Sequence, residues 1–195
     1  MHFSAVILAG GESRRMGRDK AFLEFCGRSL LAHQLETVAA LHPAEILVSG
    51  RADTDYAHLG YPVVLDSQPG CGPIAGVERA LAVARSELVL VLAVDLPRIT
   101  SAFLRRLLAL ADSGQGVVPQ TRRGLEALAA VYPKRAHAIA SDGLQNSRRM
   151  LEDFVTRCAG AGLVRIWRCP PEEAAVFANW NSPADLAGST PVPEP

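Results

Sequence analysis

The sequence predicts an α/β fold, in which helices cover both faces of a mostly parallel β-sheet to make a three-layer α/β/α sandwich. Two observations carry this prediction. Short apolar runs of strand type alternate with amphipathic helical patterns through the first half of the chain. One of these runs, residues 88–94, is apolar at every position, as expected of a strand buried between two layers of helices. The pattern is typical of a Rossmann-like sheet.

The elements predicted for the first half follow from periodicity and from residues that start or stop helices. Residues 29–41 place apolar side chains on one helical face, and Ser29 is a suitable N-cap. Pro73 suits the first position of a second helix, and Thr100 can cap a third helix that Gly114 ends. Strands are predicted at residues 5–8, 45–50, 61–65 and 88–94.

The second half of the chain is less regular. We expect one domain over residues 1–187, with halves at about 1–115 and 116–187, followed by a proline-rich flexible tail at residues 188–195. Ser182 and Pro183 are typical of the start of a last helical turn. The elements predicted here are strands at residues 116–119, 125–132, 163–167 and 177–180, and a helix at residues 147–158.

Composition excludes several classes of protein. The 195 residues contain 20 lysines and arginines and 20 aspartates and glutamates, so the charges cancel and nucleic acid is not an expected partner. The four cysteines lie apart, without the spacing of a zinc site, and are typical of reduced cytoplasmic thiols. No apolar run approaches the length of a membrane span. We therefore expect a cytoplasmic protein that does not bind a membrane.

Residues 5–20, which read AVILAGGESRRMGRDK, predict a phosphate-binding site. An apolar strand ends in Gly10 and Gly11, whose backbone N–H groups an anion can approach closely. Arg15 and Lys20 are among the cations that follow. The stretch lacks both the Gly-Lys-Ser/Thr of a P-loop and the G-x-G-x-x-G spacing of a dinucleotide-binding turn. The alternative interpretation is a tight turn followed by solvated arginines.

Two aspartates follow predicted strands at the same edge of the sheet as this loop. Asp66 comes after residues 61–65, and Asp95 comes after the apolar run at residues 88–94. Ligands of open α/β sheets bind beyond the carboxyl ends of the strands. Nucleoside triphosphates arrive with Mg²⁺, which prefers carboxylate and phosphate oxygens, so Asp95 is the predicted magnesium ligand. The alternative is that Asp95 caps the next helix or pairs with an arginine.

The segment LAGGESRRMGRDK at residues 8–20 resembles the L-A-G-G-x-S-x-R-M-G-x-D-K signature of the molybdenum cofactor guanylyltransferases, within the nucleotidyltransferase superfamily. Asp95, in the sequence DLP, is similar to the aspartate of that family's D-x-P motif, which binds magnesium. Residues 72–76 are similar to its G-P-L-A-G stretch. The resemblance implies a fold of the nucleotide-diphospho-sugar transferase type. The nucleotide-binding residues that it implies are Leu8, Ala9, Gly10, Gly11, Lys20, Gly50, Asp66, Gly72 and Asp95.

The same resemblance implies an acceptor site in the second half of the chain. The segment FANWNSPADL at residues 177–186 is similar to the family's F-x-N-x-N-T-P-E-D-L, which lies on the pterin side. Alternate positions of the strand expected there would turn Asn179 and Asn181 to one face. Arg148 and Arg149 match a basic pair near that pocket.

The sequence departs from the family pattern at a few positions. Gly50 stands where relatives commonly have asparagine, so a nucleotide contact there would come from the backbone. Ala93 stands where the family often has cysteine. Glu126 and Ala127 differ from the family's Q-P-L-x-A-L-Y pattern, which leaves the acceptor contacts at these two positions open.

The resemblance implies that the protein transfers GMP from GTP to the phosphate of molybdopterin and releases pyrophosphate. Lys20, Arg15 and Asp95, the last with Mg²⁺, would be the catalytic groups, because they neutralise the triphosphate. The implied partners are GTP and molybdopterin, with cofactor-insertion or molybdoenzyme maturation proteins as candidates. Two alternatives stay open: a CTP-dependent cytidylyltransferase of the same fold, and a nucleotide-binding module without turnover in molybdoenzyme maturation.

Overall fold

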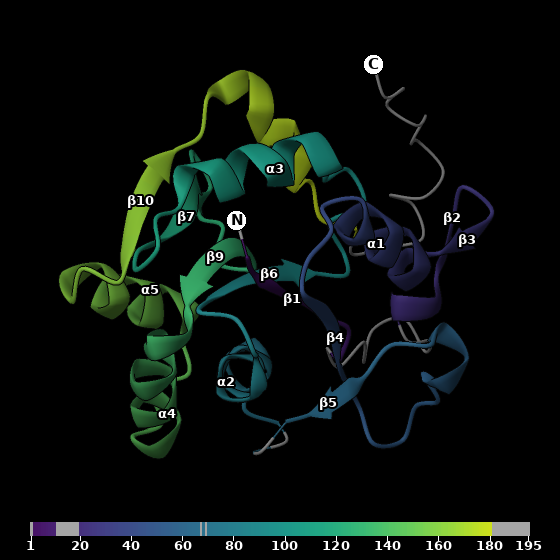
Figure 1. Ribbon diagram of the computed structural model, residues 1–195, viewed down its shortest axis with the longest axis horizontal. Helices are drawn as coiled ribbons and strands as arrows, with labels where there is room; N and C mark the ends of the chain where they lie inside the picture. The colour runs from purple at the N-terminus through teal and green to yellow at the C-terminus, as the bar shows by residue number, and fades with distance from the viewer. Residues whose placement is uncertain (1, 11–19, 67, 69, 181–195) are drawn as a thin grey trace.

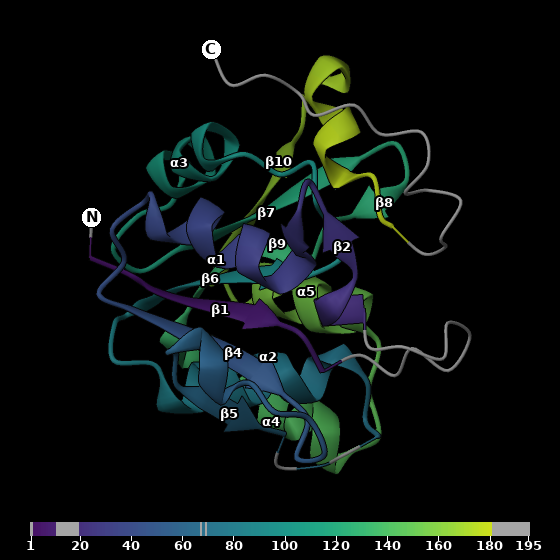
Figure 2. The ribbon, with the colours of Figure 1, turned by 90° about the vertical axis from the view of Figure 1, so that its right-hand side faces the viewer.

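A central β-sheet between two layers of helices forms the body of the protein (Figures 1 and 2). The computed structural model describes residues 2–10, 20–66, 68 and 70–180. The strands of the sheet are β1 (Ser4–Leu8), β4 (Glu45–Gly50), β5 (Val63–Leu65), β6 (Leu88–Ala93), β7 (Gly116–Thr121), β8 (Gly124–Leu125), β9 (Ala129–Pro133) and β10 (Val164–Arg168). Within the described residues their order is β10-β7-β9-β6-β1-β4-β5, with β8 paired to β7.

Most neighbouring strands of the sheet run parallel. β1 pairs in parallel with both β4 and β6, β4 pairs in parallel with β5, and β7 with β10. β9 is antiparallel to both of its neighbours, β6 and β7, and β8 is antiparallel to β7. The predicted three-layer fold around a mostly parallel sheet is therefore confirmed.

Helices cover both faces of the sheet because its central strands are apolar on both sides. The helices are α1 (Leu30–Ala39), α2 (Pro73–Val83), α3 (Ser101–Leu110), α4 (His137–Gln145) and α5 (Leu151–Gly160). On β6, Leu88, Leu90 and Leu92 belong to the core shared with α1 and α3. The alternate residues Val89 and Val91 belong to the core shared with α2, α4 and α5. Because successive side chains of a strand point to opposite faces, β6 contributes apolar side chains to the core on each side of the sheet.

Three local signals for helix starts are confirmed. Ser29 caps α1, its Oγ accepting a hydrogen bond from the backbone N–H of Ala32 at 3.2 Å. The Oγ1 of Thr100 caps α3 in the same way, accepting from the N–H of Phe103 at 3.2 Å. Pro73 is the first residue of α2, where a missing N–H costs nothing.

The chain reverses its direction of travel across the sheet at β1. From β1 it moves outward through β4 to β5, and then returns to place β6 on the other side of β1. A crevice forms beyond the carboxyl ends of two strands at such a switch point, and open α/β proteins bind their ligands there. The residues that follow β1 and β6, Gly10 and Asp95, lie at this edge.

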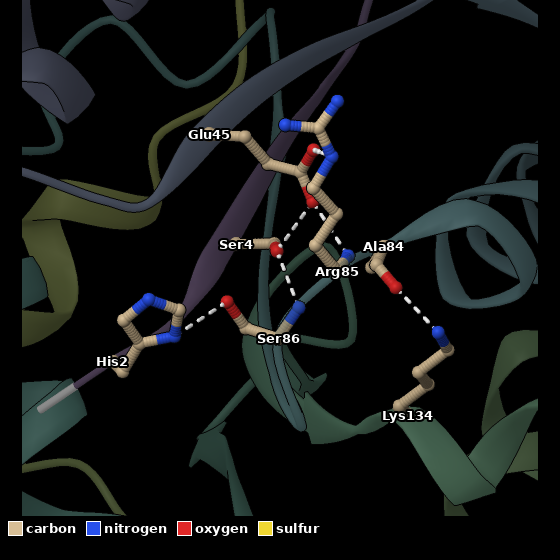
Figure 3. Close-up of polar contacts among 7 residues, drawn as sticks. All are labelled: His2, Ser4, Glu45, Ala84, Arg85, Ser86 and Lys134. Atoms are coloured by element: carbon tan, nitrogen blue, oxygen red, sulfur yellow. Dashed lines mark hydrogen bonds and ion pairs between the residues drawn. The ribbon is translucent and has the colours of Figure 1, made fainter.

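At the opposite edge of the sheet, polar side chains tie the amino ends of three strands together (Figure 3). The hydroxyl of Ser4 donates to Glu45 Oε1 at 2.7 Å and accepts from the backbone N–H of Ser86 at 3.1 Å. Glu45 Oε1 also accepts from the backbone N–H of Arg85 at 2.6 Å, and Ser86 Oγ bonds to the ring of His2. Ser4 is fully buried, so these bonds keep its hydroxyl satisfied and hold β1, β4 and β6 in register.

Four predicted elements differ in the structure. The strand predicted at residues 125–132 is divided between β8 and β9, with residues 126–128 between them, and α3 ends at Leu110 and not at Gly114. The helix predicted at residues 147–158 begins at Leu151, because a turn at 146–150 separates α5 from α4, a helix that the periodicity did not indicate. The strand predicted at residues 177–180 is wrong for the described part. Phe177 ends a 3-10 helix, and residues 178–180 have no regular structure, because the buried Phe177 and Trp180 anchor this segment to the core instead of a sheet edge. The predicted helical turn at Ser182 and the tail at 188–195 lie outside the described residues.

Short elements complete the chain. They are η1 (Lys20–Phe22), β2 (Glu24–Phe25), β3 (Arg28–Ser29), η2 (Ala57–Leu59), η3 (Lys134–Ala136) and η4 (Pro171–Phe177). β2 and β3 form a two-stranded antiparallel hairpin of their own. In the part of the chain that the structure describes, no helix is both long and apolar enough to cross a membrane.

Candidate active site

A cavity of about 410 Å³, the first cavity, opens at the switch point beyond the carboxyl ends of β1 and β6. The backbone of four glycines and side chains of both charges surround it, a lining suited to a polar ligand. The residues that line it are Leu8, Ala9, Gly10, Lys20, Ser49, Asp66, Gly70, Gly72, Pro73, Gly76, Ala93, Val94, Asp95 and Leu128.

Main-chain groups form one side of the first cavity. The N–H of Ala9 donates to the carbonyl of Ser49 at 2.8 Å, and the N–H of Val94 donates to the carbonyl of Leu8 at 3.1 Å. These bonds fix the chain as it leaves β1 and reaches Gly10. Helix α2 begins at the cavity, and its first backbone N–H groups and dipole favour an anion there. The preceding Gly72 has a φ of 75°, a conformation that favours glycine.

Asp95 and Lys20 meet in the first cavity. Lys20 Nζ lies 3.4 Å from Asp95 Oδ2, and their side chains are 22% and 23% exposed. Asp95 lies in the turn after β6, and Lys20 begins the 3-10 turn η1, so residues 75 positions apart come together. The pair places a cation and a carboxylate side by side at the cavity, and each balances the charge of the other.

Asp66 forms a second polar group of the first cavity. Ser49 Oγ donates to Asp66 Oδ1 at 3.4 Å, and burial raises the pKa of the Asp66 carboxyl above its ordinary value, with the charge of Glu78 adding to the rise. Gly76 of α2 lies directly against this pair. A Cβ there would stand 2.7 Å from Ser49 Oγ and 3.1 Å from Leu8 Cδ2, so α2 can approach the sheet this closely only with glycine.

A second cavity, also of about 410 Å³, adjoins the first and shares Ala93, Asp95 and Leu128 with it. The segment after η4 reaches this cavity because the N–H of Trp180 donates to the carbonyl of Asp95 at 3.0 Å, which brings Asn179 to its edge. The residues that line the second cavity are Ala93, Asp95, Leu96, Arg123, Gly124, Leu125, Glu126, Ala127, Leu128, Ala129, Leu151, Glu152 and Asn179.

The predicted site residues fall into three groups. Leu8, Ala9, Gly10, Lys20, Asp66, Gly72 and Asp95 line the first cavity, and Asn179 lines the second. Gly50, Arg148 and Arg149 line neither. Gly11, Arg15 and Asn181 lie outside the described residues.

The positions of Gly50 and the arginine pair have structural reasons. A Cβ at Gly50 would stand 2.5 Å from the ring of Tyr56, so this glycine makes room for a buried aromatic ring. Arg148 and Arg149 are exposed in the turn between α4 and α5, next to Leu151 of the second cavity.

Sequence reasoning missed Ser49, Leu128 and Arg123 as lining residues. Ser49 is the last-but-one residue of β4, so its place at a strand's carboxyl end was an available signal. Arg123 lies in the turn of the β7–β8 hairpin, which its neighbour Gly124 indicates. Leu128 had no local signal: it reaches both cavities because its carbonyl accepts from the N–H of Ala93 at 2.7 Å across the sheet.

Residues 5–164 match the family described as the MobA-like NTP transferase domain. The chain belongs to this family. The matched range includes the first cavity and all of the second except Asn179.

Named relatives of this NTP transferase domain agree with that assignment. A protein of Opitutus terrae named "Probable molybdenum cofactor guanylyltransferase" is 37% identical over 185 residues, 93% of this chain and 92% of the relative. The "Molybdenum cofactor guanylyltransferase" of Pseudomonas putida strain GB-1 is 33% identical over 95% of this chain and 96% of its own. The molybdopterin-guanine dinucleotide biosynthesis protein A of Archaeoglobus fulgidus shares the fold, with a TM-score of 0.75, 23% identity and coverage of 94% and 95%.

NTP transferases generally use a divalent metal, and the side chains at the two cavities fit a hard cation. Within the described residues, no group of three or more His, Cys, Asp or Glu side chains could hold a metal ion by itself. The Asp95 carboxylate is a single partly exposed acidic group that borders both cavities. This matches a hard cation that takes one or two carboxylates and completes its coordination with substrate phosphates and water.

Proposed function

We propose that this NTP transferase transfers GMP from GTP to the phosphate of molybdopterin, with release of pyrophosphate. The observation that carries the proposal is the shared border of two adjoining cavities at Asp95, because a group transfer needs two substrates held side by side. Full-length relatives named as molybdenum cofactor guanylyltransferases support the choice of substrates.

The first cavity is the proposed nucleotide site. Leu8, the last residue of β1, lines it together with Ala9 and Gly10, the start of α2 offers N–H groups to phosphate, and Lys20 supplies a positive charge. Asp66 is proposed to contact the nucleoside. Gly11, Arg15 and Gly50 remain predictions for the same site.

Asp95 is the proposed ligand of a bound Mg²⁺. When bound, such an ion supplies positive charge that stabilises the phosphate oxygens during transfer. Lys20 carries out a related task, because its ammonium neutralises the triphosphate once the nucleotide competes with Asp95 for it.

The second cavity is the proposed acceptor site, with Asn179 at its edge; Asn181, Arg148 and Arg149 remain predictions for the acceptor. The attacking group is an oxygen of the acceptor's phosphate, which is already ionised at neutral pH, so the chain need not provide a strong base. The P–O bond to the nucleotide's α-phosphorus forms as the bond to pyrophosphate breaks. Proteins of cofactor insertion or molybdoenzyme maturation are proposed to receive the product, and the cytoplasm is the proposed compartment.

The experiment that tests this function measures pyrophosphate release with GTP and with CTP, each with and without molybdopterin and Mg²⁺. We expect release only when GTP, molybdopterin and Mg²⁺ are all present. Preferred use of CTP would instead support the cytidylyltransferase alternative. Tight binding of GTP without release in the presence of molybdopterin would support a binding module.

A further inference from the structure

The second cavity contains a carboxylate that the proposed reaction does not yet explain. The acceptor carries a phosphate and is an anion, yet Glu126 lines the cavity that would receive it. Burial raises the pKa of the Glu126 carboxyl, while the hydroxyl of Thr121 and the charge of Arg123 favour its ionised form. A half-buried carboxylate facing an anionic ligand is unfavourable unless that ligand also offers hydrogen-bond donors.

The structure holds the Glu126 side chain in a defined position. Glu126 directly follows β8, and its backbone N–H donates to the carbonyl of Pro119 at 2.8 Å, which closes the β7–β8 hairpin beside the cavity. Thr121 Oγ1 donates to Glu126 Oε1 at 2.8 Å and fixes the carboxylate from the strand opposite. Each carboxylate oxygen accepts two hydrogen bonds, so one bond from Thr121 leaves acceptor capacity on both oxygens.

We propose that the Glu126 carboxylate binds the 2-amino-4-oxopyrimidine edge of the acceptor's pterin ring. That edge presents a ring N–H and an exocyclic amine N–H side by side, and a carboxylate's two oxygens can accept both. The pairing has the two-parallel-bond geometry that makes guanidinium–carboxylate contacts specific. The assignment rests on the proposed function, because it takes the acceptor to be a pterin.

The position of Glu126 agrees with the direction in which the acceptor must lie in the second cavity. Its phosphate must reach the border with the nucleotide site at Asp95, and the heterocycle then occupies the remainder of the same cavity, which Glu126 lines. Glu152 also lines this cavity, but it is exposed at the start of α5, and the structure describes no hydrogen bond that fixes its carboxylate. Glu152 is therefore a matched control: a carboxylate of the same cavity without a fixed orientation.

The test compares two fluorescent probes that lack phosphate: 6-hydroxymethylpterin, and 6-hydroxymethyllumazine, in which an oxygen replaces the 2-amino group. We expect the wild-type protein to bind the pterin more tightly than the lumazine. Glu126→Gln should weaken pterin binding about tenfold, the loss expected for a charge-assisted hydrogen bond, and should remove the preference. Glu152→Gln should keep both affinities within about twofold of wild type, since exposed groups contribute little.

A second variant separates ligand binding from folding. Thr121→Val removes the hydroxyl that orients Glu126 but keeps the carboxylate, so the preference for pterin over lumazine should shrink. The melting temperatures of Thr121→Val and Glu126→Gln are compared to show whether both variants are folded. GTP affinity should be unchanged in all three variants, because the changes lie outside the first cavity. Equal pterin affinity in wild type and a folded Glu126→Gln, or no wild-type preference for pterin over lumazine, would overturn the assignment.

The outcome is independent of the test of the proposed function. A wild-type protein that prefers pterin through Glu126 but releases no pyrophosphate would contradict the reaction and leave the assignment standing. If the wild type and Glu126→Gln turned over molybdopterin equally well, the assignment of Glu126 would be contradicted and the proposed reaction would stand.

Discussion

The contact between Lys20 and Asp95 joins the two residues with the strongest sequence signals in the chain. Both side chains are about one-quarter exposed and lie 3.4 Å apart, so groups of opposite charge meet at a cavity that would receive phosphate. In the proposed reaction, incoming phosphate groups would compete for Lys20, and a metal ion would compete for Asp95. The ion pair is therefore an arrangement that substrate binding is expected to exchange for stronger contacts.

Replacing Asp95 with asparagine tests the metal assignment. Asp95→Asn keeps the size of the side chain but removes the charge that a hard cation needs, so pyrophosphate release should fall about 10²–10³-fold, with the fold retained. Asp112→Asn, a change at an exposed aspartate before β7, is the control and should leave the rate unchanged. Near wild-type release by Asp95→Asn, measured at several Mg²⁺ concentrations, would exclude Asp95 as the ligand.

Asp66 links pH to stability through its burial. Because burial raises its pKa in the folded protein above the unfolded value near 3.8, the folded state holds this proton more tightly. The protonated Asp66 carboxyl therefore contributes to the free energy of unfolding. This contribution is fully present below the pKa that Asp66 has in the unfolded chain, and it is lost as the pH rises through the pKa that Asp66 has in the folded protein. Asp66→Asn cannot lose a proton, so the free energy of unfolding of the variant relative to wild type should increase between pH 3.5 and pH 7.

Urea denaturation at several pH values measures this difference. The same variant should bind GTP more weakly, since Asp66 lines the first cavity. Parallel stability profiles for the variant and the wild type would show that the Asp66 carboxyl has an ordinary pKa in the folded protein.

The helix α2 shows how one element shapes the site. Its start offers N–H groups to the first cavity, and its second turn lies against β1 and β4, where Gly76 has no room for a Cβ. Helix and sheet positions are therefore coupled at this residue. A change of packing here moves the N-terminus of the helix relative to the residues that end β1.

Two glycine substitutions in helices should have opposite effects. Gly76→Ala places a methyl group 2.7 Å from Ser49 Oγ and should destabilise the protein by about 1–3 kcal/mol, with weaker GTP binding. Gly160→Ala, at the end of α5, meets nothing within 4 Å and should stabilise by about 0.4–1 kcal/mol because alanine restricts the unfolded chain. Thermal and urea unfolding measure both changes. Equal effects of the two substitutions would mean that α2 is not packed this closely.

The protein as a whole has its strands tied at one edge and its cavities at the other. The polar cluster around Ser4 and Glu45 joins the amino ends of β1, β4 and β6, while their carboxyl ends are free to form a ligand site (Figure 3). A nucleotide in the first cavity would contact residues from β1, β4, α2 and the turn after β6 together. Its binding energy is then shared by elements that are far apart in the sequence.

Nucleotide binding should therefore raise the stability of the entire domain. At a GTP concentration 100 times its dissociation constant, binding adds about 2.7 kcal/mol, which corresponds to a rise in melting temperature of about 5–10 °C for a protein of this size. Part of this rise should require Mg²⁺, and Asp95→Asn should lose that part. Differential scanning fluorimetry with GTP, with and without Mg²⁺, measures it. A rise that is the same without Mg²⁺ would contradict the role of Asp95.

Local patterns were enough to predict the mostly parallel sheet, the starts of α1, α2 and α3, and the meeting of Lys20, Asp66 and Asp95 at one cavity. These predictions succeed because periodicity, caps and turn glycines act over a few residues, and because parallel strands bring their carboxyl ends to one edge. The same reasoning predicted a strand at residues 177–180, where buried aromatic contacts decide the conformation instead.

The amino-acid sequence by itself determined the fold class and the place of a carboxylate just after β6, and it predicted a phosphate-binding turn after β1. Only the tertiary structure showed that Arg123 and Leu128 line the second cavity, and that Glu126, left open by the sequence, lies there with them. The physical reason is that these residues reach the site through β9 and the β7–β8 hairpin, and antiparallel pairing between distant segments depends on long-range packing that no short stretch of sequence encodes.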